Sequence, residues 1–363
     1  MRRVGVIGGG QLGQMLGFAG RSLDIECMFL DPSPDAPAGK AGTVLRYAFD
    51  DVLGLRELAD QCELLTYEFE NVPVAAIEAL GADTTIYPPP AALRNAQDRL
   101  VEKNLFRSLG IPTPDYHSVD SRAELAEAAH RLGYPMVIKT RRHGYDGKGQ
   151  MALLSPDDLD AAWQSLGSAP LIAERMIRFD REVSIIGARR ADGVTAIYPL
   201  TENVHRDGIL RTSRAPAGSP ALNALAARHL DVLVGELGYV GVIALELFVV
   251  GDELLANEFA PRVHNSGHWT IEGARTSQFE NHLRAILGLP LGDTAAVGQV
   301  AMENLIGRFP RNPGALTTAG YYLHDYGKEP RPGRKLGHVT LVAGDVETRE
   351  RRLRALQQML QDH

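Results

Sequence analysis

The stretch from Val240 to Ala260, VGVIALELFVVGDELLANEFA, sets the architecture of the chain around it. It contains two apolar strands, Val240 to Val250 and Leu254 to Phe259. Each strand carries one carboxylate in apolar surroundings, Glu246 in the first and Glu258 in the second. A buried carboxylate is costly unless it has a partner, so this hairpin predicts a site for a charged ligand.

The length of the turn between the strands decides whether the two carboxylates meet. Gly251-Asp252 is typical of a hairpin turn. A two-residue turn would place Glu246 opposite Asn257 and direct Glu258 to the other face, because side chains alternate along a strand. A three-residue turn, Gly251 to Glu253, would place Glu246 directly opposite Glu258. We predict the three-residue turn, because Mg²⁺ suits paired carboxylates with room for phosphate oxygens and would offset their repulsion.

A polar loop, PRVHNSGHWT, follows the second strand at residues 261 to 270. Arg262, His264 and Asn265 in this loop predict an anion site. His264 and His268 have the spacing of zinc-protease ligands, but the glutamate that should follow the first histidine is absent. We therefore expect no zinc here.

A basic, glycine-rich loop follows the predicted strand Pro135 to Lys139. Residues 140 to 150 read TRRHGYDGKGQ, and their glycines allow backbone amides to turn toward phosphates. The loop lacks the G-K-[ST] ending of a Walker loop. We predict a mobile flap over polyphosphate, with a solvated basic loop as the alternative. A second basic loop, Arg331 to His338, is by itself typical of a solvated surface turn.

The segment after the flap could surround a nucleotide base and sugar. Leu171 to Glu174 is an apolar strand whose backbone edge could hydrogen-bond an adenine ring. Glu182, one strand further on, could accept hydrogen bonds from ribose hydroxyls.

The N-terminal strands Val4 to Ile7, Ile25 to Leu30 and Leu64 to Tyr67 alternate with helical segments, which predicts a doubly wound parallel sheet. Gly8-x-Gly10-x-x-Gly13 follows the first strand, and with Asp31 it nearly completes a dinucleotide fingerprint. The better nucleotide site downstream argues against NAD. The glycine turn then either holds another phosphate or is a tight turn without a ligand.

Changes of pattern along the chain predict three parts, of α/β and α+β class. These are an N-terminal Rossmann-like domain at 1–95, a domain at 96–290 with a small lid subdomain at about 111–180, and a C-terminal β-rich piece at 291–363. Three consecutive prolines, Pro88 to Pro90, mark the first boundary.

Helix signals are clear in the second part. We expect a helix over Asp98 to Leu109 whose apolar stripe is Val101, Leu105 and Leu109. Ser-x-x-Glu capping boxes open two further helices, at Ser121 and Ser277.

Composition excludes several classes of protein. The 363 residues are 44% hydrophobic and 23% charged, which is typical of a globular protein and not of a disordered or fibrous one. No apolar run reaches the roughly 20 residues of a membrane span. The net charge of −7 argues against nucleic acid as a partner, so any anion site must be local. Cys27 and Cys62 cannot build a disulfide framework, and with no visible signal peptide we expect the cytoplasm.

Together these motifs resemble the ATP-grasp carboxylate–amine ligases and, among them, the N5-carboxyaminoimidazole ribonucleotide synthetases of purine biosynthesis. The resemblance covers essentially the whole chain. It is carried by GGGQLGQM at 8–15, YEFENVP at 67–73, KTRR at 139–142, GYDGKGQ at 144–150, YPLTEN at 198–203, DGILR at 207–211 and APRVHNSGHW at 260–269. The last motif is the most specific, since other ATP-grasp enzymes share the metal hairpin but not this loop.

The resemblance implies an ATP-grasp fold and a role for each motif residue. The residues implied to bind ATP are Arg99, Lys139, Gly144, Tyr145, Asp146, Gly147, Lys148, Gly149, Gln150, Glu174, Arg175, Met176, Ile177, Glu182, His205 and Asn257. Those implied to bind the aminoimidazole ribonucleotide or the bicarbonate-derived group are Gln11, Leu12, Tyr145, Arg262, His264, Asn265 and Lys335. Glu246 and Glu258 would hold Mg²⁺, and the catalytic residues would be Arg262, His264, Lys139 and Lys148.

The implied reaction is the ATP-dependent carboxylation of 5-aminoimidazole ribonucleotide with bicarbonate, through carboxyphosphate. Either His264 or a phosphate oxygen would take the proton of the attacking amine. The resemblance implies a homodimer and no biotin, NAD or zinc. The alternatives are another ATP-grasp enzyme (a formate-dependent glycinamide ribonucleotide transformylase or a biotin carboxylase), a nicotinamide dehydrogenase, and a non-catalytic nucleotide-binding module.

Overall fold

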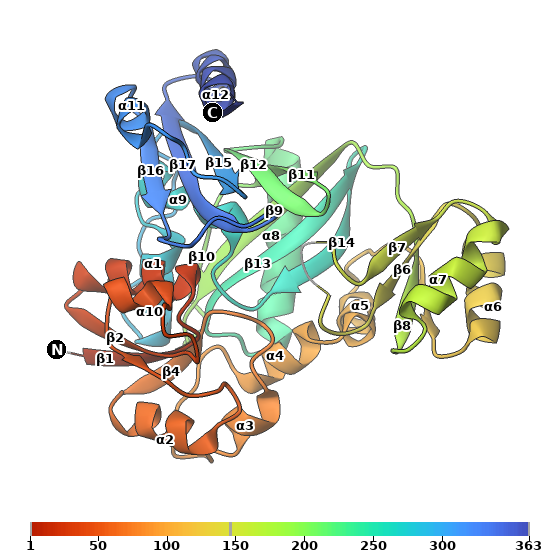
Figure 1. Ribbon diagram of the computed structural model, residues 1–363, viewed down its shortest axis with the longest axis horizontal. Helices are drawn as coiled ribbons and strands as arrows, with labels where there is room; N and C mark the ends of the chain where they lie inside the picture. The colour runs from red at the N-terminus through yellow and green to blue at the C-terminus, as the bar shows by residue number, and fades with distance from the viewer. Residues whose placement is uncertain (1, 145–146, 362–363) are drawn as a thin grey trace.

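The computed structural model describes residues 2–144 and 147–361. Three sheets organise this part of the chain: a parallel N-terminal sheet, a large central sheet and a small sheet that stands apart from the rest (Figure 1). In the described residues, no helix is long and apolar enough to cross a membrane.

The N-terminal sheet has the strand order β3-β2-β1-β4, and all its pairs are parallel, as predicted. Its strands are β1 (Arg2–Ile7), β2 (Ile25–Leu30), β3 (Val44–Leu45) and β4 (Leu64–Tyr67). The helical segments around it are α1 (Gln11–Arg21), η1 (Pro37–Lys40), α2 (Val52–Asp60), α3 (Val74–Glu78) and α4 (Pro90–Ala96). The sheet lies against the central part through packing of α1 on α10 (Gln278–Ile286).

The central sheet has nine strands in the order β14-β13-β9-β11-β12-β15-β17-β16, with β10 paired to β9. Its first strands are β9 (Arg181–Arg189), β10 (Thr195–Ile197), β11 (Thr201–Arg206), β12 (Ile209–Ala215), β13 (Gly241–Val250) and β14 (Glu253–Ala260). The segments that flank them are α5 (Arg99–Ser108), α8 (Pro220–Glu236), η3 (Asn265–Gly267) and α9 (Thr270–Gly273).

Strand β13 shows why this sheet is buried on both faces. Ile243 and Leu245 pack with the apolar face of α8, whereas Val242 and Ala244 pack with α10 and the N-terminal part. Because side chains alternate along a strand, both faces need apolar residues, and the near-continuous apolar run supplies them.

The C-terminal strands belong to this same sheet. β15 (Gln299–Ile306) pairs with β12, and β17 (Lys335–Ala343) and β16 (Tyr322–Asp325) follow it outward. Helices α11 (Pro313–Thr318) and α12 (Val346–Gln361) cover this end. The sheet therefore continues across the boundary predicted at 291, and the division into three parts remains a prediction.

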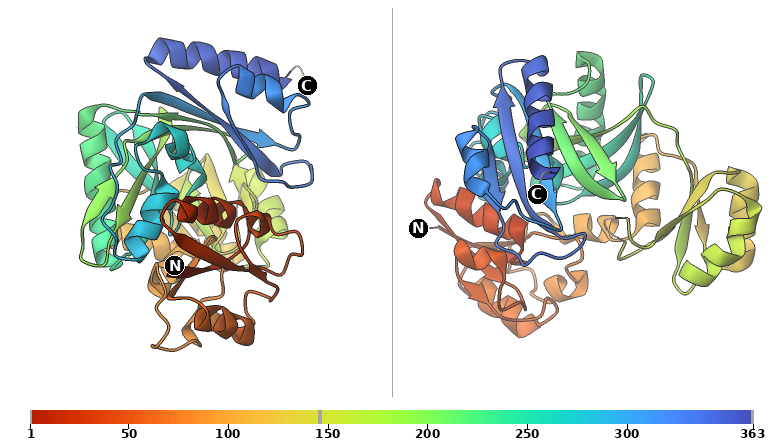
Figure 2. Two further views of the ribbon diagram at one scale, coloured as in Figure 1. Left: turned by 90° about the vertical axis from the view of Figure 1, so that its left-hand side faces the viewer. Right: turned by 45° about the horizontal axis from the view of Figure 1, so that its top comes forward.

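The small sheet has the order β5-β8-β6-β7 and all its pairs are antiparallel. It consists of β5 (Tyr116–Val119), β6 (Met136–Thr140), β7 (Gln150–Leu153) and β8 (Leu171–Arg175), with α6 (Arg122–Leu132), η2 (Pro156–Asp158) and α7 (Leu159–Leu166). Figure 2 shows that it projects away from the other two sheets. We call it the lid.

The predicted apolar stripe of α5 is wrong in one respect. Val101 is 37% exposed, whereas Glu102, Lys103 and Phe106 are buried. The helix faces a junction whose interior contains charged groups, so a search for apolar periodicity selects the wrong face. The predicted capping residues Ser121 and Ser277 do accept the amides of Glu124 and Glu280.

Candidate active site

A cleft of about 610 Å³ lies where the N-terminal sheet, the central sheet and the lid meet. The predicted residues that line it are Gln11, Leu12, Arg99, Lys139, Gly144, Gly147, Gln150, Glu174, Arg175, Met176, Ile177, Glu182, His205, Glu246, Asn257, Glu258, Arg262, His264, Asn265 and Lys335. In the described part of the flap, Lys148 and Gly149 do not line the cleft. Tyr145 and Asp146 lie outside the described residues. The structure therefore places these residues in one cleft, and the role of each residue in binding or catalysis stays a prediction.

The two hairpin carboxylates do face each other, but not through the predicted turn. Val250 pairs with Glu253, so the turn is Gly251-Asp252 and has two residues. The register then shifts between Leu247 and Glu246, which brings Glu246 opposite Glu258. The three-residue turn was therefore wrong. A β-bulge in β14 supplies the extra residue instead, and a bulge of this kind often redirects a side chain next to an active site.

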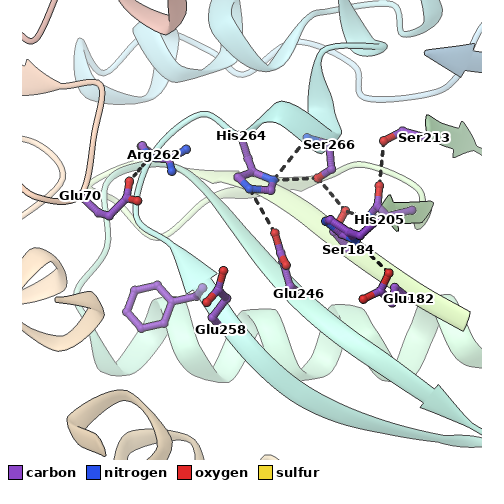
Figure 3. Close-up of polar contacts among 12 residues, drawn as sticks. Glu70, Glu182, Ser184, His205, Ser213, Glu246, Glu258, Arg262, His264 and Ser266 are labelled. Carbon is purple, nitrogen blue, oxygen red and sulfur yellow. Dashed lines mark hydrogen bonds and ion pairs between the residues drawn. The ribbon is translucent and has the colours of Figure 1, made fainter. Parts of the chain in front are cut away.

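The carboxylate of Glu246 is largely buried, close to a second carboxylate and to a histidine. Burial and the neighbouring Glu258 raise the pKa of Glu246 to about 7. Its Oε1 lies 3.1 Å from Nε2 of His264 (Figure 3), and Arg99 Nη2 lies 3.7 Å from Oε2 of Glu258. Two carboxylates on one face whose charges repel favour a cation between them.

Arg262 and Glu70 form an ion pair between the central sheet and the N-terminal part. Nε of Arg262 donates to Oε2 of Glu70 at 2.6 Å. Burial alone would raise the pKa of Glu70, but Arg262 lowers it, so the pair remains charged. Figure 3 shows the pair near His264, and Glu70, Arg262 and His264 all line the cleft. The guanidinium is thus fixed in place at the lining of the cleft.

A buried charge cluster joins the lid to the central sheet. Glu174 on β8 accepts contacts from Lys103 Nζ at 3.3 Å and from Lys139 Nζ at 3.1 Å. Burial would raise the pKa of Glu174, but the two lysines hold it at about 2. Lys103 also donates to the carbonyl of Ala256, at 3.1 Å. The Glu174 carboxylate is therefore held by two cations at the lining of the cleft, and its predicted role in ATP binding stays a prediction.

His205 and Glu182 also pair across the central sheet. Nδ1 of His205 lies 2.8 Å from Oε2 of Glu182. Although burial opposes its charge, Glu182 raises the pKa of His205. One oxygen of Glu182 is thereby occupied by His205, and the predicted contact of Glu182 with a ribose stays a prediction.

The glycine turn at the N-terminus of α1 already holds a carboxylate. Glu68, just after β4, accepts the backbone amide of Gly10 with one oxygen and that of Gly13, at 2.5 Å, with the other. Asp31 accepts the amide of Gly9 at 2.8 Å. These amides are the donors that a dinucleotide phosphate would use. Because carboxylates already occupy these amides, the arrangement argues against a dinucleotide phosphate at this turn.

Several residues that line the cleft or support it received no role from the sequence. Glu68 and Glu70 line the cleft just beyond the C-terminal end of β4. Two glutamates directly after a buried strand are the sequence feature from which a role in the site could have been predicted. Glu102 accepts the amide of Phe259 at 2.7 Å. Lys328 donates to Oε1 of Gln11, and no sequence signal connects two residues so far apart.

Comparisons with known proteins cover almost the whole chain. Residues 1–97 match the ribonucleotide synthetase preATP-grasp domain, 104–279 the ATP-grasp domain, and 300–352 the phosphoribosylaminoimidazole carboxylase C-terminal domain. The N5-carboxyaminoimidazole ribonucleotide synthase of Pseudomonas aeruginosa is 49% identical over 359 residues, or 99% of both chains. That of Brucella melitensis is 48% identical over 346 residues, which cover 93% of this chain and 96% of the other.

Solved structures agree with these relatives. The N5-carboxyaminoimidazole ribonucleotide synthetase of Thermus thermophilus matches with a TM-score of 0.94 and 50% identity, over 98% of each chain. The Aspergillus clavatus enzyme, in complex with ADP and 5-aminoimidazole ribonucleotide, matches with a TM-score of 0.91 and 32% identity, over 100% of this chain and 99% of that one. The ATP-grasp fold with an N-terminal parallel-sheet domain is thereby confirmed.

Proposed function

The chain belongs to the family of N5-carboxyaminoimidazole ribonucleotide synthases, and from that premise we propose how its cleft carries out the reaction. The protein is an ATP-grasp ligase that converts 5-aminoimidazole ribonucleotide to N5-carboxyaminoimidazole ribonucleotide at the expense of ATP, in purine biosynthesis. One observation carries the proposal for the site. The Glu246–Glu258 pair and the loop of Arg262 and His264 line a single cleft.

ATP would lie between the lid and the central sheet. Lys139 extends from β6 toward its phosphates, and Glu182 accepts from its ribose. The amides of Arg175 and Met176 already donate to the carbonyls of Asp115 and Pro135, at 2.8 Å and 3.2 Å. The purine would therefore use the carbonyl oxygens of this segment or the amide of Ile177.

The paired carboxylates fit a divalent cation. Their oxygens form a hard donor set of the kind Mg²⁺ prefers, and their mutual repulsion disfavours an empty pair. We propose that Glu246 and Glu258 hold Mg²⁺. When bound, the cation offsets negative charge on the transferring phosphoryl group.

The remaining side chains would handle the carboxyl group and its charge. Bicarbonate is a poor electrophile, so ATP would first convert it to carboxyphosphate. Lys139 and the flap residue Lys148 would offset charge on the phosphates, and the flap would exclude water from this labile anhydride. Arg262, fixed by Glu70, would stabilise the anhydride and the released phosphate. Asn265 would bind the carboxyl group beside it.

The ribonucleotide would bind near the glycine turn. Gln11 and Leu12 line this end of the cleft, and Lys335 lines it from the C-terminal part. Lys328 contacts Gln11 directly. Lys328 and Lys335 would pair with the phosphate of the ribonucleotide, which gives a negatively charged protein a local anion site.

We further propose a cytoplasmic homodimer, on the strength of the family resemblance. Size-exclusion chromatography with light scattering tests the dimer, and fractionation of the source cells tests the location.

The reaction is tested by measuring ADP release with bicarbonate or formate, each with and without 5-aminoimidazole or glycinamide ribonucleotide. We expect release that depends on bicarbonate and is coupled to 5-aminoimidazole ribonucleotide. Formate dependence would favour a transformylase, and coupling to biotin would favour a biotin carboxylase. An NADH fluorescence change on mixing would instead favour a dehydrogenase.

A further inference from the structure

A line of buried polar groups runs from the central sheet to His264 (Figure 3). Nδ2 of Asn203 donates to Oγ of Ser184 at 2.9 Å, and Ser184 donates to Oγ of Ser266 at 2.7 Å. Oγ of Ser266 lies 2.9 Å from Nδ1 of His264. Both serines are at most 1% exposed and Asn203 is 5% exposed. Strands β9 and β11 and the turn η3 supply these groups, so only the folded chain assembles them.

One backbone group fixes the direction of this line. The amide N–H of Ser266 points to Nδ1 of His264 at 3.3 Å. A backbone amide can only donate, so Nδ1 must present a lone pair. The ring hydrogen therefore resides on Nε2, the atom that lies 3.1 Å from Oε1 of Glu246. The hydroxyl of Ser266 consequently donates to Nδ1, in line with every other link.

The far end of the line cannot carry a proton away. Ser213 donates to Oδ1 of Asn203 at 2.8 Å, which sets the orientation of the Asn203 amide and leaves its N–H₂ facing Ser184. Unlike a histidine or a carboxyl group, this amide does not exchange its protons readily with a relay. The line therefore orients His264 but does not connect it to a proton sink.

The main chain of His264 is also clamped. Gln278, which is fully buried, accepts the His264 amide at 3.0 Å and donates to the His264 carbonyl at 2.6 Å. Backbone and ring are thus held by separate groups. A histidine fixed in this way presents one N–H in one direction.

We propose that Ser266, Ser184 and Asn203 are positioning residues that hold His264 as a hydrogen-bond donor to oxygens in the cleft, and that His264 is not the base in the reaction. This rests on the proposed function and deepens it. When the amine of the ribonucleotide forms its bond to the carboxyl carbon, its N–H bond breaks. The proton then passes to an oxygen of the phosphate released from carboxyphosphate, the other acceptor considered for this step.

The tautomer can be measured without substrate. Full-length protein labelled with ¹⁵N-histidine gives long-range ¹H–¹⁵N spectra, in which His264 is identified by the loss of its signals in His264→Gln. We expect a pyridine-like Nδ1 and a pyrrole-like Nε2. A protonated Nδ1 in the wild-type protein would overturn the proposal, whatever substrate the enzyme uses.

The positioning role is tested by measuring both the Nδ1 resonance of His264 and the turnover of the Ser266→Ala variant. We expect the Nδ1 resonance to move toward that of a ring nitrogen without a strong hydrogen bond. Turnover should fall roughly tenfold, as for other groups that orient a functional histidine, with the KM for ATP unchanged. Ser184→Ala should change both readouts in the same direction by less, and it supplies the test if Ser266→Ala does not fold.

Thr340→Val is the matched control. Thr340 is buried in the same sheet, and its hydroxyl has no hydrogen-bond partner among the described residues. This variant should change neither the spectrum nor turnover. In Ser266→Ala, a spectral change without a loss of turnover, or a loss without a spectral change, would contradict the proposal. If the wild-type protein forms no ADP when it is given ATP, bicarbonate and 5-aminoimidazole ribonucleotide, that result would instead refute the proposed function.

Discussion

Glu246 on β13 lies directly opposite Glu258 on β14, and the irregular register at Asn257 is what places both carboxylates on one face. A regular two-residue hairpin would have separated them. The neighbouring Glu258 contributes to the raised pKa of Glu246, and two carboxylates placed in this way favour a cation between them.

Glu258→Gln should reduce ATP-dependent carboxylation on the order of a hundredfold or more, because a metal-binding charge is worth several kcal/mol in the transition state. Unfolding by urea should show equal or greater stability, since the variant relieves repulsion of Glu246. Glu253→Gln, at an exposed position on the same strand, is the control for both measurements. Full activity in Glu258→Gln would refute the metal site.

Glu68→Ala should destabilise the protein by about 1–3 kcal/mol, because the backbone amides of Gly10 and Gly13 lose their acceptor. Urea denaturation measures the loss. Glu63→Ala removes a carboxylate from an exposed ion pair with Arg2 and should cost less than about 1 kcal/mol. Equal effects in the two variants would show that Glu68 does not hold the glycine turn.

Lys103→Met should cost about 3–5 kcal/mol of stability, because it leaves the buried Glu174 with only one of its two cations. The KM for ATP should rise as well, since the cluster ties the lid to the central sheet. Arg131→Met, in an exposed pair with Glu127, is the matched control. Thermal unfolding and ATP titration separate the two effects. An unchanged melting temperature for Lys103→Met would be incompatible with a buried structural pair.

His282 should make stability depend on pH. Its Nε2 lies 2.9 Å from Thr66 on β4, its Nδ1 accepts the amide of Val242 on β13 at 3.1 Å, and burial lowers its pKa from 6.5 to about 3. Below pH 6.5 the unfolded chain takes up a proton that the folded protein does not take up until about pH 3.

Stability should therefore fall as the pH drops from 6.5 toward 3, by on the order of a few kcal/mol from this residue. His282→Gln should flatten the plot of unfolding free energy against pH over that range. His130→Gln, at an exposed position on α6, should leave the slope as it is in the wild-type protein. If both variants retain the wild-type slope, His282 is not its source.

Much of this protein is predictable from local sequence. The parallel strands Ile25–Leu30 and Leu64–Tyr67 have the predicted bounds, because a short apolar run between turn residues specifies a buried strand over a few positions. Capping by Ser121 and Ser277 is equally local. Many of the residues that line the cleft were also predicted, either within strands of the central sheet or in the segments that follow strands.

The tertiary structure alone decided how those residues act. No local pattern distinguishes a three-residue turn from a two-residue turn followed by a bulge, because the choice depends on how β14 packs. The bond from the Gly13 amide to Glu68 joins residues 55 apart, and the bond from Ser184 to Ser266 joins residues 82 apart. Apolar periodicity could not place Glu102 and Lys103 inside, because their burial depends on charges supplied by distant strands. Sequence thus determined which groups are present and which elements carry them. Packing determined which groups face one another and in which protonation state.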